Sequence, residues 1–133
     1  MSGDRFPQEA DATARTTLDL GDRLCGDGDV EGAERTYSRA VELARSSEDP
    51  LELEAGAKAA FMLGLTLADS YGAVEAYGAY KDSLELGRRS GTREGLETGA
   101  QAAFNLAWVS RETQNAGDAV KAYLSRINEG GYA

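Results

Sequence analysis

The sequence predicts an all-α fold built from three antiparallel helix pairs. One observation is an internal repeat: the run Gly56–Leu63 (GAKAAFML) recurs as Gly99–Leu106 (GAQAAFNL), 43 positions further along the chain. A second observation is that apolar residues recur at three- and four-residue spacing within each copy, which is typical of one face of a helix. Repeats of this length correspond to supersecondary units that stack on one another. We therefore expect a single domain, 1–133, with copies at about 7–48, 49–91 and 92–129.

The same 43-residue spacing holds outside that run, with no insertion or deletion. The equivalent residues are Ala33, Ala76 and Ala119; Tyr37, Tyr80 and Tyr123; Val41, Leu84 and Ile127; and, in the first two copies, Pro7 and Pro50. Three copies in one register favour a repeat architecture, in which equivalent residues occupy equivalent packing sites.

The first copy divides at the turn Gly26-Asp27-Gly28-Asp29. One helix is expected before this turn. Asp29 is expected to be the N-cap of a second helix, because Asp side chains accept hydrogen bonds from the first free backbone N–H groups. The second helix should end near Arg45.

In the second copy, Asp49 is the expected N-cap of a helix with Pro50 at its first position and Glu52 closing a capping box. This helix should end near Ser70, before the turn Ser70-Tyr71-Gly72. A second helix carrying Ala76, Tyr80 and Leu84 should end at Gly91, a residue favoured just after helix ends.

In the third copy, Thr92 takes the N-cap position. The repeat register then predicts a first helix carrying Phe104, a turn, and a second helix carrying Ala119 and Tyr123. Glycines 56, 95 and 99 lie within predicted first helices, where each costs about 1 kcal/mol relative to alanine. Close contact with the preceding helix and a kink are both consistent with these glycines.

The composition excludes several classes of function. The chain has no histidine and one cysteine, so metal sites and nucleophile pairs that need these residues cannot form within it. Its net charge of −9 is a poor match for nucleic acid. No apolar run is long enough to cross a bilayer and the N-terminus shows no secretory signal. We expect a cytoplasmic protein that is not an enzyme and binds no cofactor, nucleic acid or membrane.

The repeated residues resemble the tetratricopeptide repeat family, and Asn105-Leu106-Ala107 is similar to the longer repeats of kinesin-light-chain-like proteins. The motif in the first two copies is Leu20-Gly21-x-x-Leu24 with Ala33-x-x-x-Tyr37, and Leu63-Gly64-x-x-Leu67 with Ala76-x-x-x-Tyr80. The resemblance implies a right-handed superhelix whose first helices line a concave groove for a partner. The 43-residue period is longer than the usual 34, so HEAT or armadillo repeats stay an alternative.

The resemblance also implies which residues line that groove. They are Arg15, Lys58, Phe61, Met62, Leu65, Phe104, Asn105, Trp108 and Arg111. Phe61 and Leu65 share a helical face, as do Phe104 and Trp108, because each pair is four residues apart. For the two phenylalanines, packing between adjacent first helices is an equally good interpretation. Some family members use asparagine and basic residues to bind a peptide carboxylate, but Asp19 and Met62 replace the asparagine in two copies here.

The sequence therefore predicts a protein-interaction or scaffold module that binds a peptide or partner protein in its groove. The alternative is an accessory protein that binds a small apolar ligand in a pocket between first helices. The residues after Glu129 are too few for a covering helix, so the face of Ala119, Tyr123 and Ile127 is expected to be open. This open face favours a homodimer; a further domain downstream of this sequence is the alternative explanation.

Overall fold

A computed structural model describes residues 12–129, except for the side chains of Ala116, Tyr123 and 127–129. This part of the chain forms five helices and no strand, so the all-α prediction is confirmed. The helices are α1 (Ala14–Gly26), α2 (Val30–Arg45), α3 (Pro50–Ser70), α4 (Ala73–Ser90) and α5 (Arg93–Glu129). Pro7, where the first copy was expected to begin, lies outside the described residues.

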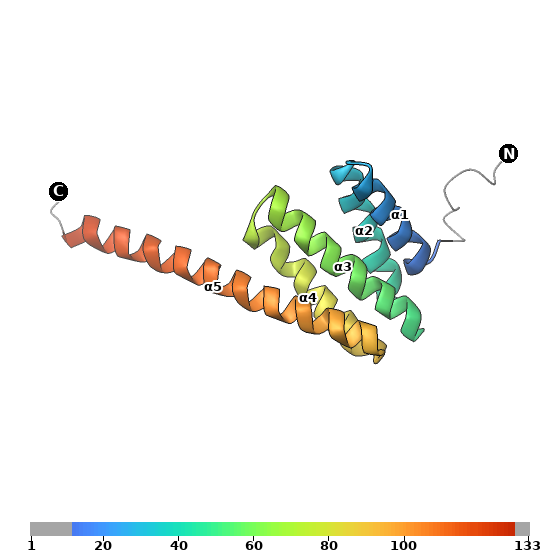
Figure 1. The fold of residues 1–133 in the computed structure, drawn as a ribbon. Helices are drawn as coiled ribbons and strands as arrows, with labels where there is room; N and C mark the ends of the chain where they lie inside the picture. The colour runs from blue at the N-terminus through green and yellow to red at the C-terminus, as the bar shows by residue number, and fades with distance from the viewer. Residues whose placement is uncertain (1–11, 130–133) are drawn as a thin grey trace.

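The helices form two layers (Figure 1). Helices α1, α3 and α5 lie side by side in one layer, and α2 and α4 lie behind them in the other. Helix α3 is central and packs against all four other helices. We call the outer surface of α1, α3 and α5 the first-helix face.

Local signals in the sequence set most helix ends. Asp29 accepts a hydrogen bond from the Gly32 N–H at 2.9 Å and begins α2. Thr92 Oγ1 accepts one from the Gly95 N–H at 3.0 Å before α5. Gly91 ends α4 with φ at 66°, a left-handed conformation that glycine adopts without steric cost. These three predictions are confirmed.

The predicted capping box at the start of α3 is half right: Asp49 caps the helix as expected, but Glu52 does not close the box. Asp49 caps α3 through the Leu51 N–H at 3.0 Å. Glu52 instead reaches the adjacent helix, where its Oε1 accepts a hydrogen bond from the Ala14 N–H at 2.7 Å. The first N–H groups of α1 have no acceptor within the helix and lie at its positive dipole end, and this makes the helix start a favourable site for a carboxylate.

The first two helix pairs share one tyrosine–glycine contact, with its residues 43 positions apart. The Tyr37 ring lies over Gly21 and the Tyr80 ring lies over Gly64, in the same contact between paired helices. Both tyrosines are buried, as are the equivalent alanines 33 and 76. The side chain of Tyr123, the third equivalent residue, lies outside the described part of the chain.

The close-contact explanation for Gly56 is confirmed. A Cβ atom at Gly56 would overlap the side chain of Ala44 on α2. The α4–α5 crossing is equally close, since a Cβ at Gly87 would overlap the carbonyl oxygen of Gly95.

The described residues contain no third helix pair. The structure has one continuous helix of 37 residues, α5, where the sequence predicted a helix, a turn and a second helix. The earlier turns use Gly28 and Gly72 at positive φ. Gln114 and Asn115 hold the positions equivalent to Tyr71 and Gly72, and no described residue between 93 and 129 has positive φ. Positions 114 and 115 thus lack the glycine that the earlier turns use, and the helix continues through them. We call its second half, residues 111–129, the arm; it extends away from the other helices (Figure 1).

Candidate functional site

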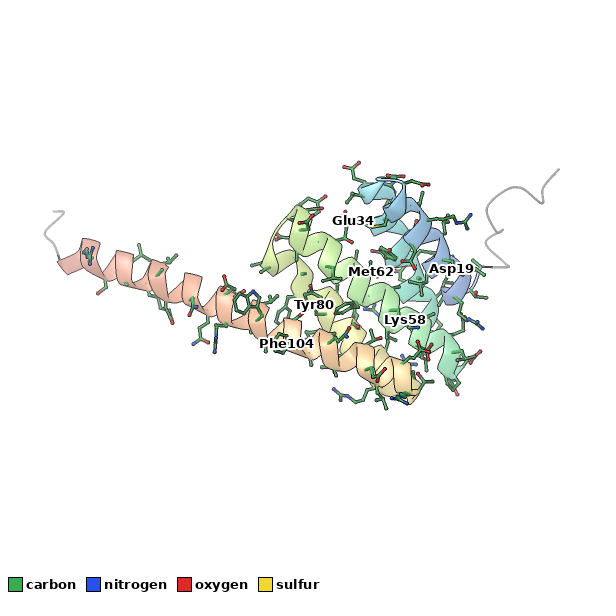
Figure 2. The ribbon with its side chains drawn as sticks, in the orientation of Figure 1. Asp19, Glu34, Lys58, Met62, Tyr80 and Phe104 are labelled. Carbon is green, nitrogen blue, oxygen red and sulfur yellow. The ribbon has the colours of Figure 1, made fainter. Side chains whose placement is uncertain are left out.

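The first-helix face contains a hollow of about 220 Å³ between α1, α3 and α5. Its lining comes from all three helices: Leu18, Asp22, Lys58, Phe61, Met62, Thr98 and Gln101. We call it the three-helix hollow. Lys58, Phe61 and Met62 were predicted groove residues, and the structure brings these three together. Figure 2 shows Lys58 and Met62 on α3.

A second hollow of about 200 Å³, the α5 hollow, is lined by Phe104, Ala107, Trp108 and Arg111. Three of these were predicted groove residues. Phe104 is 76% exposed and Trp108 is 58% exposed, unusual values for large aromatic side chains. Phe104, Trp108 and Arg111 follow Gln101 at three- and four-residue spacing, so one face of α5 connects the two hollows.

Phe61 and Phe104 occupy equivalent repeat positions but different environments. Phe61 is partly buried, with its ring centroid 6.1 Å from that of Tyr80. Phe104 projects from α5 with most of its surface exposed (Figure 2). The difference arises because α5 covers the outer side of α3, whereas no described helix covers the outer side of α5. Packing within the protein therefore explains why position 61 is an aromatic residue, but it does not explain the aromatic residue at position 104.

The other predicted residues do not line either hollow. Arg15 is exposed at the start of α1, and Leu65 is 40% exposed on α3. Asn105 is half-buried and hydrogen-bonds to the Tyr80 hydroxyl; burial raises the pKa of that hydroxyl and the bond to Asn105 opposes the rise. The asparagine that matches the carboxylate-binding motif is thus engaged in packing.

The charges in the three-helix hollow are largely paired within the protein. Lys58 Nζ lies 2.8 Å from Glu94 Oε1 and 3.5 Å from Glu54 Oε2. The hydrogen bond to Glu94 raises the pKa of Lys58, although burial opposes it, and the same bond lowers the pKa of Glu94. Asp22 accepts a hydrogen bond of 2.6 Å from the Tyr37 hydroxyl. A ligand in this hollow would compete with existing partners for either charge.

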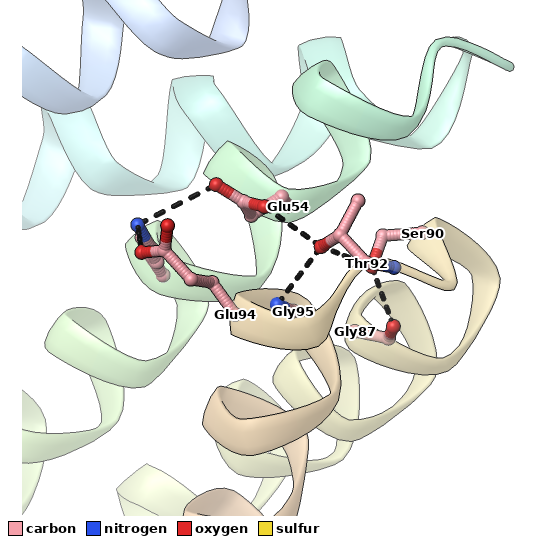
Figure 3. Close-up of polar contacts among 7 residues, drawn as sticks. Glu54, Gly87, Ser90, Thr92, Glu94 and Gly95 are labelled. Carbon is pink, nitrogen blue, oxygen red and sulfur yellow. Dashed lines mark hydrogen bonds and ion pairs between the residues drawn. The ribbon is translucent and has the colours of Figure 1, made fainter.

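Glu54 connects this ion pair to the N-terminus of α5 (Figure 3). Its Oε1 accepts a hydrogen bond of 2.7 Å from Thr92 Oγ1, the oxygen that also caps α5 through Gly95. Ser90 Oγ donates to the Gly87 carbonyl at 2.7 Å at the end of α4. The network fixes where α5 begins and so positions its half of the hollow.

A third concave region was missed by sequence reasoning. This α4–α5 cleft, of about 460 Å³, is lined by Val74, Tyr77, Ser110, Thr113 and Gln114. It lies where α5 leaves the body, and it exists because α5 continues past the predicted turn. The one sequence feature that could have indicated this cleft is the three- and four-residue spacing of small and apolar residues, which continues along α5 as far as Thr113. Within residues 12–129 no group of three acidic or cysteine side chains is placed to hold a metal ion.

Comparison with models of protein families, with curated proteins and with solved structures finds no match to this chain. Among the described helices, none is both long and apolar enough to cross a bilayer.

Proposed function

We propose that this protein is a non-catalytic, cytoplasmic interaction module of the tetratricopeptide kind, which binds a peptide or partner protein on its first-helix face. In this proposal its paired helices belong to a right-handed superhelix, with α5 at its edge. The observation that supports the proposal most strongly is the exposure of Phe104 and Trp108 beside an apolar hollow. Large aromatics that are exposed together on a rigid helix are typical anchors of protein interfaces.

The shape of the face favours a peptide or helix as the ligand. The two hollows follow one face of α5, so an elongated segment can contact both. Each has a volume of about 200 Å³, below the roughly 300–1,000 Å³ typical of pockets that enclose a small molecule. An apolar side chain of the partner would enter the α5 hollow, with the rest of the segment lying toward Gln101.

The charge of the chain gives the expected selectivity. A net charge of −9 attracts basic segments and repels acidic ones. Lys58 is already paired with Glu54 and Glu94, so the three-helix hollow is no strong site for a carboxylate. The proposed ligand is therefore an apolar or aromatic segment flanked by basic residues.

A small apolar ligand in the three-helix hollow is the second candidate. It is supported by the partly buried side chains of Leu18, Phe61 and Met62, which together form an apolar wall. Its test is native mass spectrometry of protein purified from its own cytoplasm: a retained ligand that is lost in Met62→Glu would favour it.

Selection of peptides from a random display library tests the main proposal. We expect enriched peptides with an aromatic or aliphatic anchor beside basic residues. Trp108→Ala should weaken their binding by 1–3 kcal/mol, about 5- to 150-fold. Tyr71→Ala is the matched control, because Tyr71 is also an exposed aromatic, at 59%, but lies in the α3–α4 turn. Peptides that bind both variants equally would contradict the proposal.

A further inference from the structure

Helix α5 carries one stripe of residues at alternating four- and three-residue spacing along its length. In the first half the stripe is Gly95, Gly99, Ala102, Leu106 and Val109. In the second half it continues, in the same register, as Thr113, Ala116, Val120, Tyr123 and Ile127. This spacing is the heptad pattern of a helix that packs against another helix along a narrow seam.

The first half of the stripe is the interface with α4. Gly95, Gly99, Ala102 and Val109 are buried, and Leu106 is partly buried. Ala102 and Val109 belong to one apolar cluster with Ala76 and Tyr80 of α4. The same seam therefore already functions as a helix-packing surface within the chain.

The second half of the stripe leaves the body without a covering helix among the described residues. Val120 is 57% exposed and the adjacent Leu124 is 52% exposed. Helices in water obtain most of their stability from packing of an apolar face, and a single helix of about this length is marginal without it. The arm has the sequence of a packed helix and needs a partner helix.

We propose that this partner is the arm of a second copy, and that two arms pair antiparallel to form a symmetric homodimer. Charge supports a second copy as the occupant. The whole chain carries −9, but the arm has three basic and three acidic residues and no net charge. Two arms can therefore pack together without the electrostatic repulsion that would oppose a contact between the acidic bodies.

The antiparallel direction follows from two features. It places the bodies at opposite ends of a paired segment about 28 Å long, at 1.5 Å per residue, which exceeds the screening length of about 8 Å. It also gives a complementary register. When position 116 lies beside position 120 of the second copy, Glu112 flanks the second copy's Arg126, and symmetry makes this pair twice.

The same register supplies a cover for the α4–α5 cleft. Position 127 of the second copy falls level with Val109, which is itself buried against α4, so the end of the second arm reaches the mouth of the cleft where α5 leaves α4. Val74 and Tyr77 line the cleft there and are 63% and 40% exposed. The end of the second arm would thus cover this apolar cleft. The pairing uses a different face of α5 from Phe104 and Trp108, so it stands apart from the proposed function.

Sedimentation equilibrium of the full chain, from about 1 to 200 μM, tests the pairing. The wild type should sediment as twice its 14.1 kDa mass, and Val120→Glu should weaken the dimer at least tenfold. Ala122→Glu is the matched control: it adds the same charge on the opposite side of the arm, and the dimer should persist. A wild type that stays at 14.1 kDa throughout would overturn the proposal, as would a Val120→Glu dimer of unchanged strength.

A charge exchange tests the register. Glu112→Arg alone and Arg126→Glu alone should each weaken the dimer roughly tenfold, because each creates two like-charge contacts. The double variant Glu112→Arg/Arg126→Glu should restore it, since the pairs re-form with the signs reversed. A double variant as weak as the single ones would rule out this antiparallel register.

Discussion

The ring of Tyr37 lies so close over Gly21 that a Cβ atom at position 21 would stand 2.6 Å from ring carbon Cε1. The hydroxyl at the end of the same ring donates to Asp22 at 2.6 Å. Tyr80 lies over Gly64 in the same way on the second helix pair. Each pair is therefore joined at a point where the absence of a side chain on one helix admits an aromatic ring from the other.

Gly64→Ala should destabilise the protein by about 1–3 kcal/mol, because the added methyl group forces the buried Tyr80 ring to move. Gly78→Ala is the control within α4, where an added Cβ meets no atom within 4 Å. That change should be neutral or stabilise by up to about 1 kcal/mol. Urea unfolding followed by circular dichroism measures both. Equal effects of the two substitutions would contradict the packing described here.

Tyr37 should make stability fall at alkaline pH. Burial, followed by the hydrogen bond to Asp22, raises the pKa of its hydroxyl. Above about pH 10 the unfolded chain loses this proton, while the folded chain keeps it. The unfolded state then binds fewer protons, so the free energy of unfolding decreases as pH rises.

Tyr37→Phe isolates this contribution. The variant should be less stable by about 1 kcal/mol at pH 8, where the hydrogen bond is lost, and should lose less stability than the wild type between pH 8 and 10.5. Urea unfolding at both pH values decides the matter. If both proteins lose the same amount, Tyr37 is not the group responsible.

Thr92→Ala should cost about 1–2 kcal/mol, because it removes the N-cap of α5 and the hydrogen bond to Glu54. Thr66→Ala is the comparison, since Thr66 lies inside α3 and bonds only the Met62 carbonyl of the preceding turn. It should change stability by less than about 0.5 kcal/mol. Thermal unfolding of the two variants tests this, and a smaller cost at Thr92 than at Thr66 would contradict it.

Phe61→Ala and Phe104→Ala should differ, although both alter the same repeat position. Phe61 packs against Tyr80, and its removal should cost about 2–4 kcal/mol. Phe104 is 76% exposed, and its removal should cost less than about 1 kcal/mol. Chemical unfolding measures both changes. Similar losses would mean that Phe104 is covered in the folded protein.

Sequence patterns predicted those parts of the fold that depend on local chemistry. Asp29 and Thr92 each begin a helix by accepting a hydrogen bond from a backbone N–H three residues on, and Gly91 ends one by its left-handed conformation. The register of Tyr37 and Tyr80 was also predictable, because their partners Gly21 and Gly64 repeat with them. The hydrogen-bond partner of Glu52 was predicted wrongly, because its actual partner, Ala14 of α1, is distant in sequence.

The third copy shows what a repeat register alone does not determine. The register predicted a turn in the third copy, but Gln114 and Asn115, which align with Tyr71 and Gly72, do not supply the glycine that reverses the chain at Gly28 and Gly72. The exposure of the candidate site residues likewise depends on the path of α5, which the register does not determine. Phe61 and Phe104 are indistinguishable by register, and their environments differ because one lies under α5 and the other lies on its open side.

The most direct test of the proposed function is photo-cross-linking in an extract of the cells that produce the protein, with p-benzoylphenylalanine replacing Phe104. We expect an adduct with a second protein species, which should disappear when Trp108→Ala is added. The same probe at the exposed Tyr71 is the control and should not give that adduct. No adduct at position 104, or the same adducts at both positions, would contradict the claim that the first-helix face binds a partner.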